Sequence, residues 1–307
     1  MLPSAGSDSS VQAVFQRAAI VSQHRIGRDT YRLSLECPEI ARAIHPGQFI
    51  MVRIAGTDDP LLGRPFALYD TRMGVDDSIL GVDLVYLVMG RMTTRLSDLR
   101  IRQEVDIWGP LGNGFSPAPC THLIMVAGGI GQTPFVALAN EALGRKRYGR
   151  NIGDWAGGVT LCYGARTADY LAGLDDFQRA GVLPKLATDD GSRGHHGYVT
   201  DLLRMELEPR GRDSLSIGDG EESRSLSSGV VRVVCCGPEP MMQAVAAICE
   251  REAIPCQVSL ETPMACGIGA CFTCVAPIRT GPDGDWDYRR TCLEGPVFDA
   301  AQVVWEA

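Results

Sequence analysis

Short runs in which apolar and polar residues alternate fill residues 12–119, among them YRLSLEC, GQFIMVRI and GVDLVYLVM. Alternation with a period of two residues predicts β-strands that have one buried face. Glycine, proline and aspartate separate these runs, which is typical of turns between antiparallel strands. We therefore expect residues 12–119 to form an antiparallel β-barrel or sandwich.

The pattern changes at about residue 120. HLIMVAGG, GVTLCYGAR and VRVVCCGPEP are nearly continuous apolar runs that reach glycine, and the first and third lead into helix-like stretches. Continuous apolar strands indicate burial on both faces of a sheet. The order of strand, glycine turn and helix predicts an open parallel α/β sheet over residues 120–253.

Three further segments complete the organisation. Residues 1–11 are small and polar, which predicts a flexible tail. Residues 205–229 are rich in glycine, serine and charged residues and are expected to form an exposed loop. Residues 254–307 contain a tight group of cysteines, and we expect them to form a small C-terminal module.

Composition narrows the possible functions. The 307 residues carry a net charge of −8 without a concentrated basic face, which argues against nucleic acid as the main partner. No apolar run reaches the roughly 18 residues of a membrane span, and the first residues lack the features of a secretory signal. We expect a cytoplasmic protein, where eleven cysteines favour metal or redox chemistry over disulfides.

Four of the cysteines have an informative spacing. Cys266, Cys271, Cys274 and Cys292 follow the pattern C-x4-C-x2-C-x17-C. This pattern matches the plant-type run that ligates a 2Fe-2S cluster, with three close thiolates and a distant fourth. Structural zinc usually uses two C-x2-C pairs, of which this segment has one. We therefore predict that these four residues hold a 2Fe-2S cluster, with zinc or no metal as the alternatives.

Two glycine turns follow predicted strands and indicate a nucleotide site. VAGGIGQTP places Gly128, Gly129 and Gly131 before Thr133, which we expect to be the N-cap of a helix, and CCGPEPMM supplies Gly237 and Pro238. Backbone N–H groups at a helix start favour phosphate. Pro134 occupies the third glycine position of the dinucleotide fingerprint, so the turn alone is weak evidence, and a purely structural turn is the alternative.

A nicotinamide and an iron–sulfur cluster exchange different numbers of electrons. The nicotinamide transfers two electrons as a hydride, whereas a 2Fe-2S cluster carries one at a time. A flavin is stable in both kinds of exchange and would connect them. The predicted barrel is therefore the place to look for a flavin site.

Six segments together resemble a known family: LGRPFALYD, YLVMGRMTTRLS, GPLGNGF, GGIGQTP, CGPEPMM and MACGIGACFTC with RRTCLEGPVF. They occur in the order and spacing of the ferredoxin–NADP reductase superfamily. Because the cysteine module is C-terminal, the chain is most similar to the electron transfer subunits of dihydroorotate dehydrogenase. The resemblance covers residues 12–300.

The resemblance implies a set of FAD-binding residues in the barrel. They are Arg64, Pro65, Phe66 and Ala67, then Val85, Tyr86 and Leu87, and finally Met92 and Thr93. Three of them depart from the family pattern, because Ala67 replaces a serine, Leu87 an arginine and Met92 a glycine. Arg91 or Arg95 is a candidate to restore the lost positive charge. Thr262 and Pro263 also replace a charged pair before the cluster segment.

The segment LATDDGSRGHHGYVTDLL resembles the family segment that borders the nucleotide. Asp189 and Asp190 would oppose a 2′-phosphate, which favours NAD over NADP; a solvated acidic loop is the alternative. We interpret His195 and His196 as loop residues. No catalytic residue is assigned, because hydride transfer between nicotinamide and flavin requires no protein base.

The family implies a relay in de novo pyrimidine (UMP) biosynthesis. Dihydroorotate would be oxidised on an FMN-containing catalytic subunit, the chain would pass the electrons to NAD⁺, and the two subunits would form a heterotetramer. One alternative is the same role in a different complex, with a hydrogenase, a sulfide dehydrogenase or a ferredoxin-dependent transhydrogenase. The other is a regulatory module that has lost its flavin.

Overall fold

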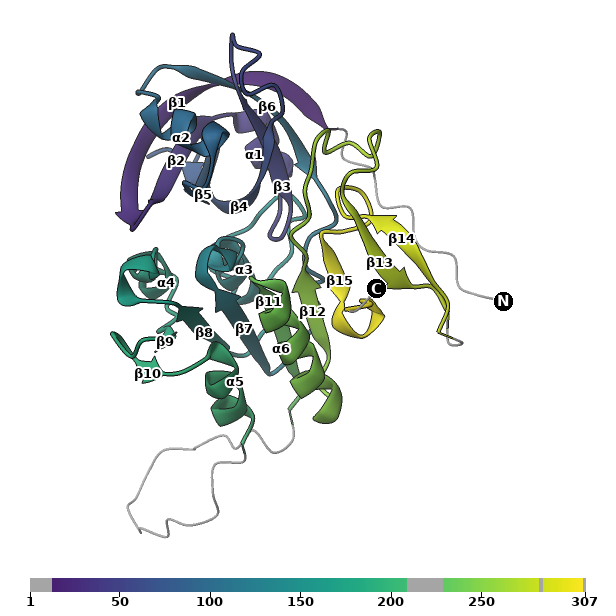
Figure 1. The fold of residues 1–307 in the computed structure, drawn as a ribbon. Helices are drawn as coiled ribbons and strands as arrows, with labels where there is room; N and C mark the ends of the chain where they lie inside the picture. The colour runs from purple at the N-terminus through teal and green to yellow at the C-terminus, as the bar shows by residue number, and fades with distance from the viewer. Residues whose placement is uncertain (1–12, 209–228, 282–283, 306–307) are drawn as a thin grey trace.

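The computed structural model describes residues 13–208, 229–281 and 284–305. Its N-terminal part is a closed barrel of six antiparallel strands, which confirms the predicted barrel (Figure 1). Around the barrel the strands follow the order β1 (Val14–Gly27), β2 (Thr30–Glu36), β5 (Ile79–Leu87), β4 (Arg64–Met73), β3 (Phe49–Ile54) and β6 (Glu104–Leu111). Two helices accompany them, α1 (Pro38–Ala43) and α2 (Arg91–Asp98). The inward residues form one apolar core that includes the buried Leu33, Leu84 and Ile107.

The second part is a sheet of seven strands below the barrel (Figure 1). Its order is β10 (His195–His196), β9 (Lys185–Thr188), β8 (Val159–Ala165), β7 (His122–Gly128), β11 (Val231–Cys236), β12 (Cys256–Ser259) and β15 (Val297–Asp299). All neighbours are parallel except β12 and β15. The predicted parallel sheet is confirmed, with an antiparallel strand at one edge.

Helices cover both faces of this sheet. One face packs on α3 (Phe135–Ala142) and α4 (Leu174–Arg179), and the other packs on α5 (Val199–Leu207) and α6 (Glu239–Arg251). Successive residues of β7 join the two cores in turn, Met125 on the first face and Val126 on the second. This double burial explains why the strand is apolar throughout its length.

The start of α3 differs from the prediction. Thr133 has helical φ and ψ angles of −57° and −38° and is the C-cap residue of the preceding 3-10 turn. A short 3-10 turn, η1 (Gly129–Gln132), comes first, and Pro134 is the N-cap residue of α3. The predicted capping role of Thr133 is therefore wrong.

The cysteine segment belongs to both the sheet and a smaller unit. Strands β13 (Val275–Arg279) and β14 (Trp286–Arg290) form a separate hairpin, whereas β12 and β15 at the two ends of the segment extend the central sheet. Two 3-10 turns, η2 (Ala168–Tyr170) and η4 (Ala300–Gln302), complete the elements. Both ends of the cysteine segment are thus anchored in the sheet.

Some expectations fall on other parts of the chain. The predicted tail, 1–11, and most of the predicted loop, 209–228, lie outside the described residues. Residues 205–207 continue helix α5 instead of beginning a loop. His195 and His196 form the edge strand β10, so their loop assignment is also wrong. Within the described residues, no helix has the length and apolar character needed to span a membrane.

A buried ion pair lies where the chain passes from the barrel to the sheet. The Glu141 carboxylate on α3 is fully buried, and its Oε1 accepts a hydrogen bond of 2.8 Å from Nε of Arg150. A second guanidinium nitrogen, Nη2, contacts Oε2. Nη1 of the same arginine donates to the carbonyl of Phe115, which follows the last barrel strand. One guanidinium therefore connects α3 with the end of the barrel.

Glu141→Ala is expected to lower the free energy of unfolding by about 3 to 5 kcal/mol, because it leaves the Arg150 charge buried without its partner. Urea denaturation would measure the change. Glu104→Ala is the matched control, because Glu104 is exposed and lies 3.9 Å from Arg17; its effect should stay within about 0.5 kcal/mol. Similar losses in both variants would contradict the assignment.

Candidate functional site

A cavity of about 590 Å³ lies between the barrel, the sheet and the cysteine segment. We call it the central cavity, and its volume is typical of sites for cofactors and small ligands. All nine predicted FAD residues line it: Arg64, Pro65, Phe66, Ala67, Val85, Tyr86, Leu87, Met92 and Thr93. Strands β4 and β5 and the start of α2 bring these residues together. The predicted residues thus form one continuous wall.

Arg64 supplies a positive charge at the rim of this wall. Its Nη1 donates to the backbone carbonyls of Leu62 and Gly63 at 3.2 and 2.9 Å. Among the described residues, no carboxylate forms an ion pair with it. Its guanidinium charge is therefore available to a phosphate group, which arginine binds through paired N–H donors.

The Thr93 hydroxyl forms hydrogen bonds with the backbone at the start of α2. Its hydroxyl donates to the carbonyl of Gly90 at 3.1 Å and accepts from the backbone N–H groups of Met89 and Gly90. A hydroxyl has only one proton to donate, so this residue fixes the start of α2. The backbone N–H groups of the first turn of α2 are then the donors that favour an anion at the cavity wall.

The two arginines considered as replacements for the lost charge both pair with Asp59. Nη2 of Arg95 lies 2.9 Å from Oδ2 of Asp59, and Nη2 of Arg91 contacts the same oxygen. Only Arg91 lines the central cavity. Arg91 is therefore the better placed of the two candidates.

The two predicted nucleotide turns pack against each other at the ends of β7 and β11. A Cβ atom at Gly131 would lie 2.3 Å from the carbonyl oxygen of Cys236, and one at Gly128 would lie 2.8 Å from Pro238. Such contacts leave room only for glycine. Of the predicted nucleotide residues, Thr133 lines the central cavity, whereas Gly128, Gly129, Gly131, Gly237 and Pro238 lie outside its lining. The glycines shape the junction behind the wall.

Cys236 and Glu261 are two cavity residues that the sequence reasoning missed. Burial raises the pKa of the Cys236 thiol, and the charge of Glu261 raises it further, so the thiol stays protonated. Desolvation also raises the pKa of Glu261 above its ordinary value. Their positions in the sequence could have revealed them. Each lies at or just after the carboxyl end of a strand of the sheet, β11 or β12, where open α/β sheets bind ligands.

The four predicted ligands differ in exposure. Cys274 and Cys292 are buried, Cys266 is half-buried and Cys271 is exposed. Their thiols interact in pairs, Cys266 with Cys271 and Cys274 with Cys292. Within the described residues, no group of three or more His, Cys, Asp or Glu side chains is arranged to hold a metal ion. The sequence spacing of the four cysteines is the observation that favours an iron–sulfur cluster here.

Hydrogen bonds in the loop between these cysteines favour the thiolate form of their side chains. The Thr273 hydroxyl donates to Sγ of Cys271 at 3.2 Å, and the backbone N–H of Ile268 donates to Sγ of Cys266 at 3.4 Å. The hydroxyl and N–H of Thr273 lower the pKa of Cys271 to about 6. Thiolates are the form that binds iron, and donors to sulfur tune a cluster.

Hydrogen bonds connect the cysteine loop to the barrel and to the residue that follows β14. The indole N–H of Trp108 on β6 donates to the carbonyl of Cys266 at 2.8 Å. The hydroxyl of the fully buried Thr291 donates to the carbonyl of Cys274 and lies 2.5 Å from the Thr262 hydroxyl. Thr262 and Pro263, which depart from the family pattern, also line the central cavity. The two residues that depart from the family pattern therefore lie between the central cavity and the cysteines.

The segment predicted to border the nucleotide lies at the end of β9. Asp190 Oδ1 accepts from the hydroxyl and N–H of Ser192 at 2.6 and 3.0 Å, and these bonds lower its pKa. The adjacent Asp189 is exposed, and its backbone N–H donates to the carbonyl of Ala165. His195 Nε2 lies 3.4 Å from Oδ2 of Asp201, and neither histidine lines the central cavity.

Three family models match successive parts of the chain. Residues 17–115 match an oxidoreductase FAD-binding domain, residues 125–247 an oxidoreductase NAD-binding domain, and residues 261–304 the iron–sulfur cluster binding domain of dihydroorotate dehydrogenase B. These matches fall on the barrel, the sheet and the cysteine segment in turn. They agree with the predicted order of the three functions.

Proteins named as the electron transfer subunit of dihydroorotate dehydrogenase B (NAD⁺) match nearly the full chain. The protein from Desulforamulus reducens is 32% identical over 94% of this chain and 98% of its own, and the one from Geobacillus thermodenitrificans is 33% identical with the same coverage. The Clostridium acetobutylicum protein is 35% identical over 85% of this chain and 87% of its own.

Among solved structures, the fold is similar to a chain of an NADH-dependent reduced ferredoxin–NADP oxidoreductase. The TM-score is 0.73 at 24% identity, and the match covers 94% of this chain and 90% of that one. At this identity the likeness supports the shared fold only.

Gly131→Ala is expected to slow reduction of bound flavin by NADH about 10-fold or more, because the new methyl group would push the nucleotide turn away from Cys236. Stopped-flow absorbance would measure the rate. Gly153→Ala is the matched control, because a Cβ there meets no atom within 4 Å. An unchanged rate in Gly131→Ala would contradict this role of the turn.

Cys274→Ser is expected to abolish the visible absorbance and the reduced-state electron paramagnetic resonance signal of the cluster, because one thiolate ligand is lost. Iron content per chain would fall in parallel. Cys120→Ser, outside the cysteine segment, should retain both. Full iron content in Cys274→Ser would rule out Cys274 as a ligand.

Proposed function

Because the chain belongs to the family of dihydroorotate dehydrogenase B electron transfer subunits, we propose that it carries electrons from a dihydroorotate-oxidising subunit to NAD⁺. The partner would be the FMN-containing catalytic subunit of pyrimidine biosynthesis, joined with this chain in a heterotetramer. FAD in the central cavity and a 2Fe-2S cluster on Cys266, Cys271, Cys274 and Cys292 would supply the exchange between single electrons and a hydride.

One observation carries the proposal: the same cavity has walls from all three parts of the chain. Phe66 and Tyr86 belong to the barrel, Ile130 belongs to the nucleotide turn, and Pro263 and Met264 belong to the segment that leads into Cys266. A flavin held there would meet the nucleotide side and the cluster side at once. Electron transfer through one protein needs this closeness.

The protein groups around the cavity bind and orient instead of exchanging protons. Arg64 and the first turn of α2 would hold the pyrophosphate, and the apolar wall of β4 and β5 would exclude water from the ring. Ala67 supplies no hydroxyl to this wall, and Cys236 is a neutral thiol. Hydride transfer requires no protein base, so this composition suits the reaction.

NAD is the proposed nucleotide. The ionised Asp190 at the end of β9, held by Ser192, would repel a 2′-phosphate if the adenosine ribose lies beside it. Asp189 adds a second negative charge. An acidic side chain beside the ribose favours a nucleotide without a 2′-phosphate.

Co-expression with the dihydroorotate dehydrogenase catalytic subunit of the same organism tests the assignment. We expect a stable complex that contains FAD, FMN and iron and forms one NADH per dihydroorotate consumed, an activity that neither subunit shows alone. Cys274→Ser should reduce this activity at least 100-fold, and Cys120→Ser should leave it intact.

Other outcomes would overturn the proposal. A chain that purifies with a hydrogenase or another oxidoreductase, and never with the dihydroorotate-oxidising subunit, would serve a different complex. A purified chain without flavin absorbance would indicate a regulatory module.

A further inference from the structure

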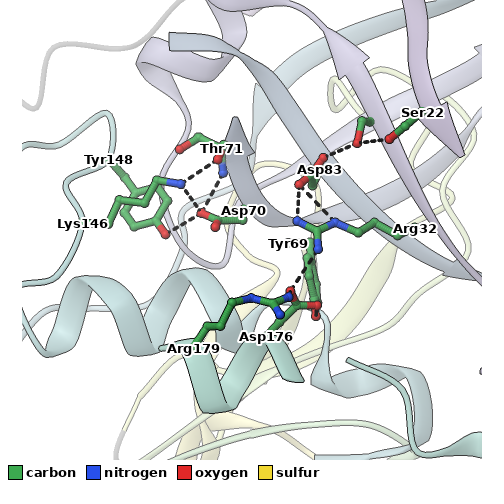
Figure 2. Close-up of polar contacts among 11 residues, drawn as sticks. Ser22, Arg32, Tyr69, Asp70, Thr71, Asp83, Lys146, Tyr148, Asp176 and Arg179 are labelled. Atoms are coloured by element: carbon green, nitrogen blue, oxygen red, sulfur yellow. Dashed lines mark hydrogen bonds and ion pairs between the residues drawn. The ribbon is translucent and has the colours of Figure 1, made fainter. Parts of the chain in front are cut away.

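Strand β4 continues from the central cavity to the boundary between barrel and sheet. Pro65 and Ala67 line the cavity, and Tyr69 follows two residues later on the same strand. The hydroxyl of Tyr69 donates a hydrogen bond of 2.7 Å to Oδ2 of Asp176 on α4 (Figure 2). The strand that forms part of the proposed flavin wall is therefore tied directly to a helix of the nucleotide sheet.

A second barrel strand reaches the same carboxylate. Nη1 of Arg32 on β2 donates to Oδ1 of Asp176 at 2.9 Å, and its Nε donates to Oδ2 of Asp83 on β5 at 3.1 Å. The guanidinium also lies over the Tyr69 ring, 5.4 Å from its centroid. Figure 2 shows that the arginine stands between the two carboxylates. Asp176 thus receives donors from two strands of the barrel.

These groups are removed from solvent. Only 6% of the Asp83 side chain and 12% of the Asp176 side chain are exposed, and Tyr69 is fully buried. Burial alone would lower the pKa of Arg32, but the charges of Asp83 and Asp176 more than offset it and raise the pKa. Burial and the charge of Asp176 raise the pKa of Tyr69, which stays a neutral donor. Charged hydrogen bonds of this kind fix direction as well as distance.

The start of α4 allows this close approach. Gly173 precedes the helix with a φ of +73°, and a Cβ there would lie 2.4 Å from the Tyr69 hydroxyl and 3.7 Å from Oε1 of Gln132. Gln132 ends the η1 turn and is fully buried, and within the described residues its amide has no hydrogen-bond partner. The contact between Tyr69 and α4 therefore lies beside the nucleotide turn.

We propose that Asp176 is a positioning residue for hydride transfer: it holds the nucleotide turn at a fixed orientation to the strand that carries the flavin wall. The proposal rests on the FAD and NAD roles proposed above. It does not depend on the partner or on the cluster.

An independent contact keeps the barrel and the sheet joined when Asp176 is changed. Asp70, the next residue of β4, accepts from Nζ of Lys146 at 2.7 Å and from the Tyr148 hydroxyl at 2.8 Å. Both donors follow α3, on the other side of β4 in Figure 2. Loss of the Asp176 contacts should therefore change orientation without separating the two parts.

Asp176→Asn tests the proposal in the full chain reconstituted with FAD and cluster. The amide retains the shape but loses the charge that attracts Arg32. We expect the limiting rate of flavin reduction at saturating NADH to fall about 10-fold, because small misplacements of reacting groups are costly. The dissociation constant of NADH and the flavin content should change less than about 2-fold. NADH supplies the electrons, so the result is independent of the partner assignment.

Arg179→Gln is the matched control. Arg179 pairs with Asp176 from the same helix, so this change removes a partner of the carboxylate but no contact with the barrel. Its limiting rate should stay within 2-fold of the original. Equal losses in both variants, or an unchanged rate in Asp176→Asn, would overturn the proposal.

Tyr69→Phe provides a second, milder test, which decides the question if Asp176→Asn folds poorly. It removes only the hydroxyl and keeps the buried ring. We expect the limiting rate to fall about 3-fold at constant flavin content, and the losses of the two variants to combine less than additively, because Arg32 and Tyr69 act on the same carboxylate. A normal rate in Tyr69→Phe, or fully additive losses in the double variant, would overturn the proposal.

Discussion

Buried carboxylates at the boundary between barrel and sheet are the constraint on which the rest of the molecule depends. Asp70, Asp83, Asp176 and Glu141 all lie there, and each faces a basic side chain at hydrogen-bond distance. Burial of a charge is costly unless the geometry of its partners is nearly ideal. Two of these pairs, Arg32 with Asp176 and Lys146 with Asp70, join the barrel to the sheet, and few relative orientations of the two parts satisfy both. The orientation that does so places the cavity walls opposite each other.

The central cavity depends on this orientation because its walls are distant in sequence. Arg64 and Leu260 line the same space although 196 positions separate them. No single part of the chain encloses the cavity. Conversely, the apolar residues of the wall would be open to water without the other two parts, so assembly and cofactor binding support one another.

The sequence predicted the parts of the fold whose patterns are local. Alternation in YRLSLEC and continuous apolarity in HLIMVAGG indicated a barrel strand and a doubly buried strand, and both are confirmed. The candidate flavin residues could be chosen because a family pattern places them in three short runs. The spacing of Cys266, Cys271 and Cys274 is equally local, so the cysteine motif can be recognised from one short segment.

Contacts between distant segments could not be predicted in this way. Nothing near Asp176 in the sequence shows that Arg32 and Tyr69 will contact it. These residues are distant in sequence and meet only because the barrel packs against the sheet. Cys236 and Glu261 were overlooked for the same reason, since strand pairing brings their strand ends together. The N-cap error at Thr133 is different: a 3-10 turn precedes the helix, and the residues of such a turn differ little from those of a first helical turn.

Strand β15 gives the cysteine segment a place in the order of assembly. It pairs antiparallel to β12, from which the whole segment departs, so the sheet reaches its seventh strand only after the cysteine loops have been synthesised and folded back. Domains generally form from the N-terminus during synthesis. Barrel and inner strands can thus exist as an early scaffold, while closure of the sheet edge and enclosure of Cys274 and Cys292 belong to one late event. The last strand of the sheet is therefore in place only when the whole cysteine segment has folded back onto β12.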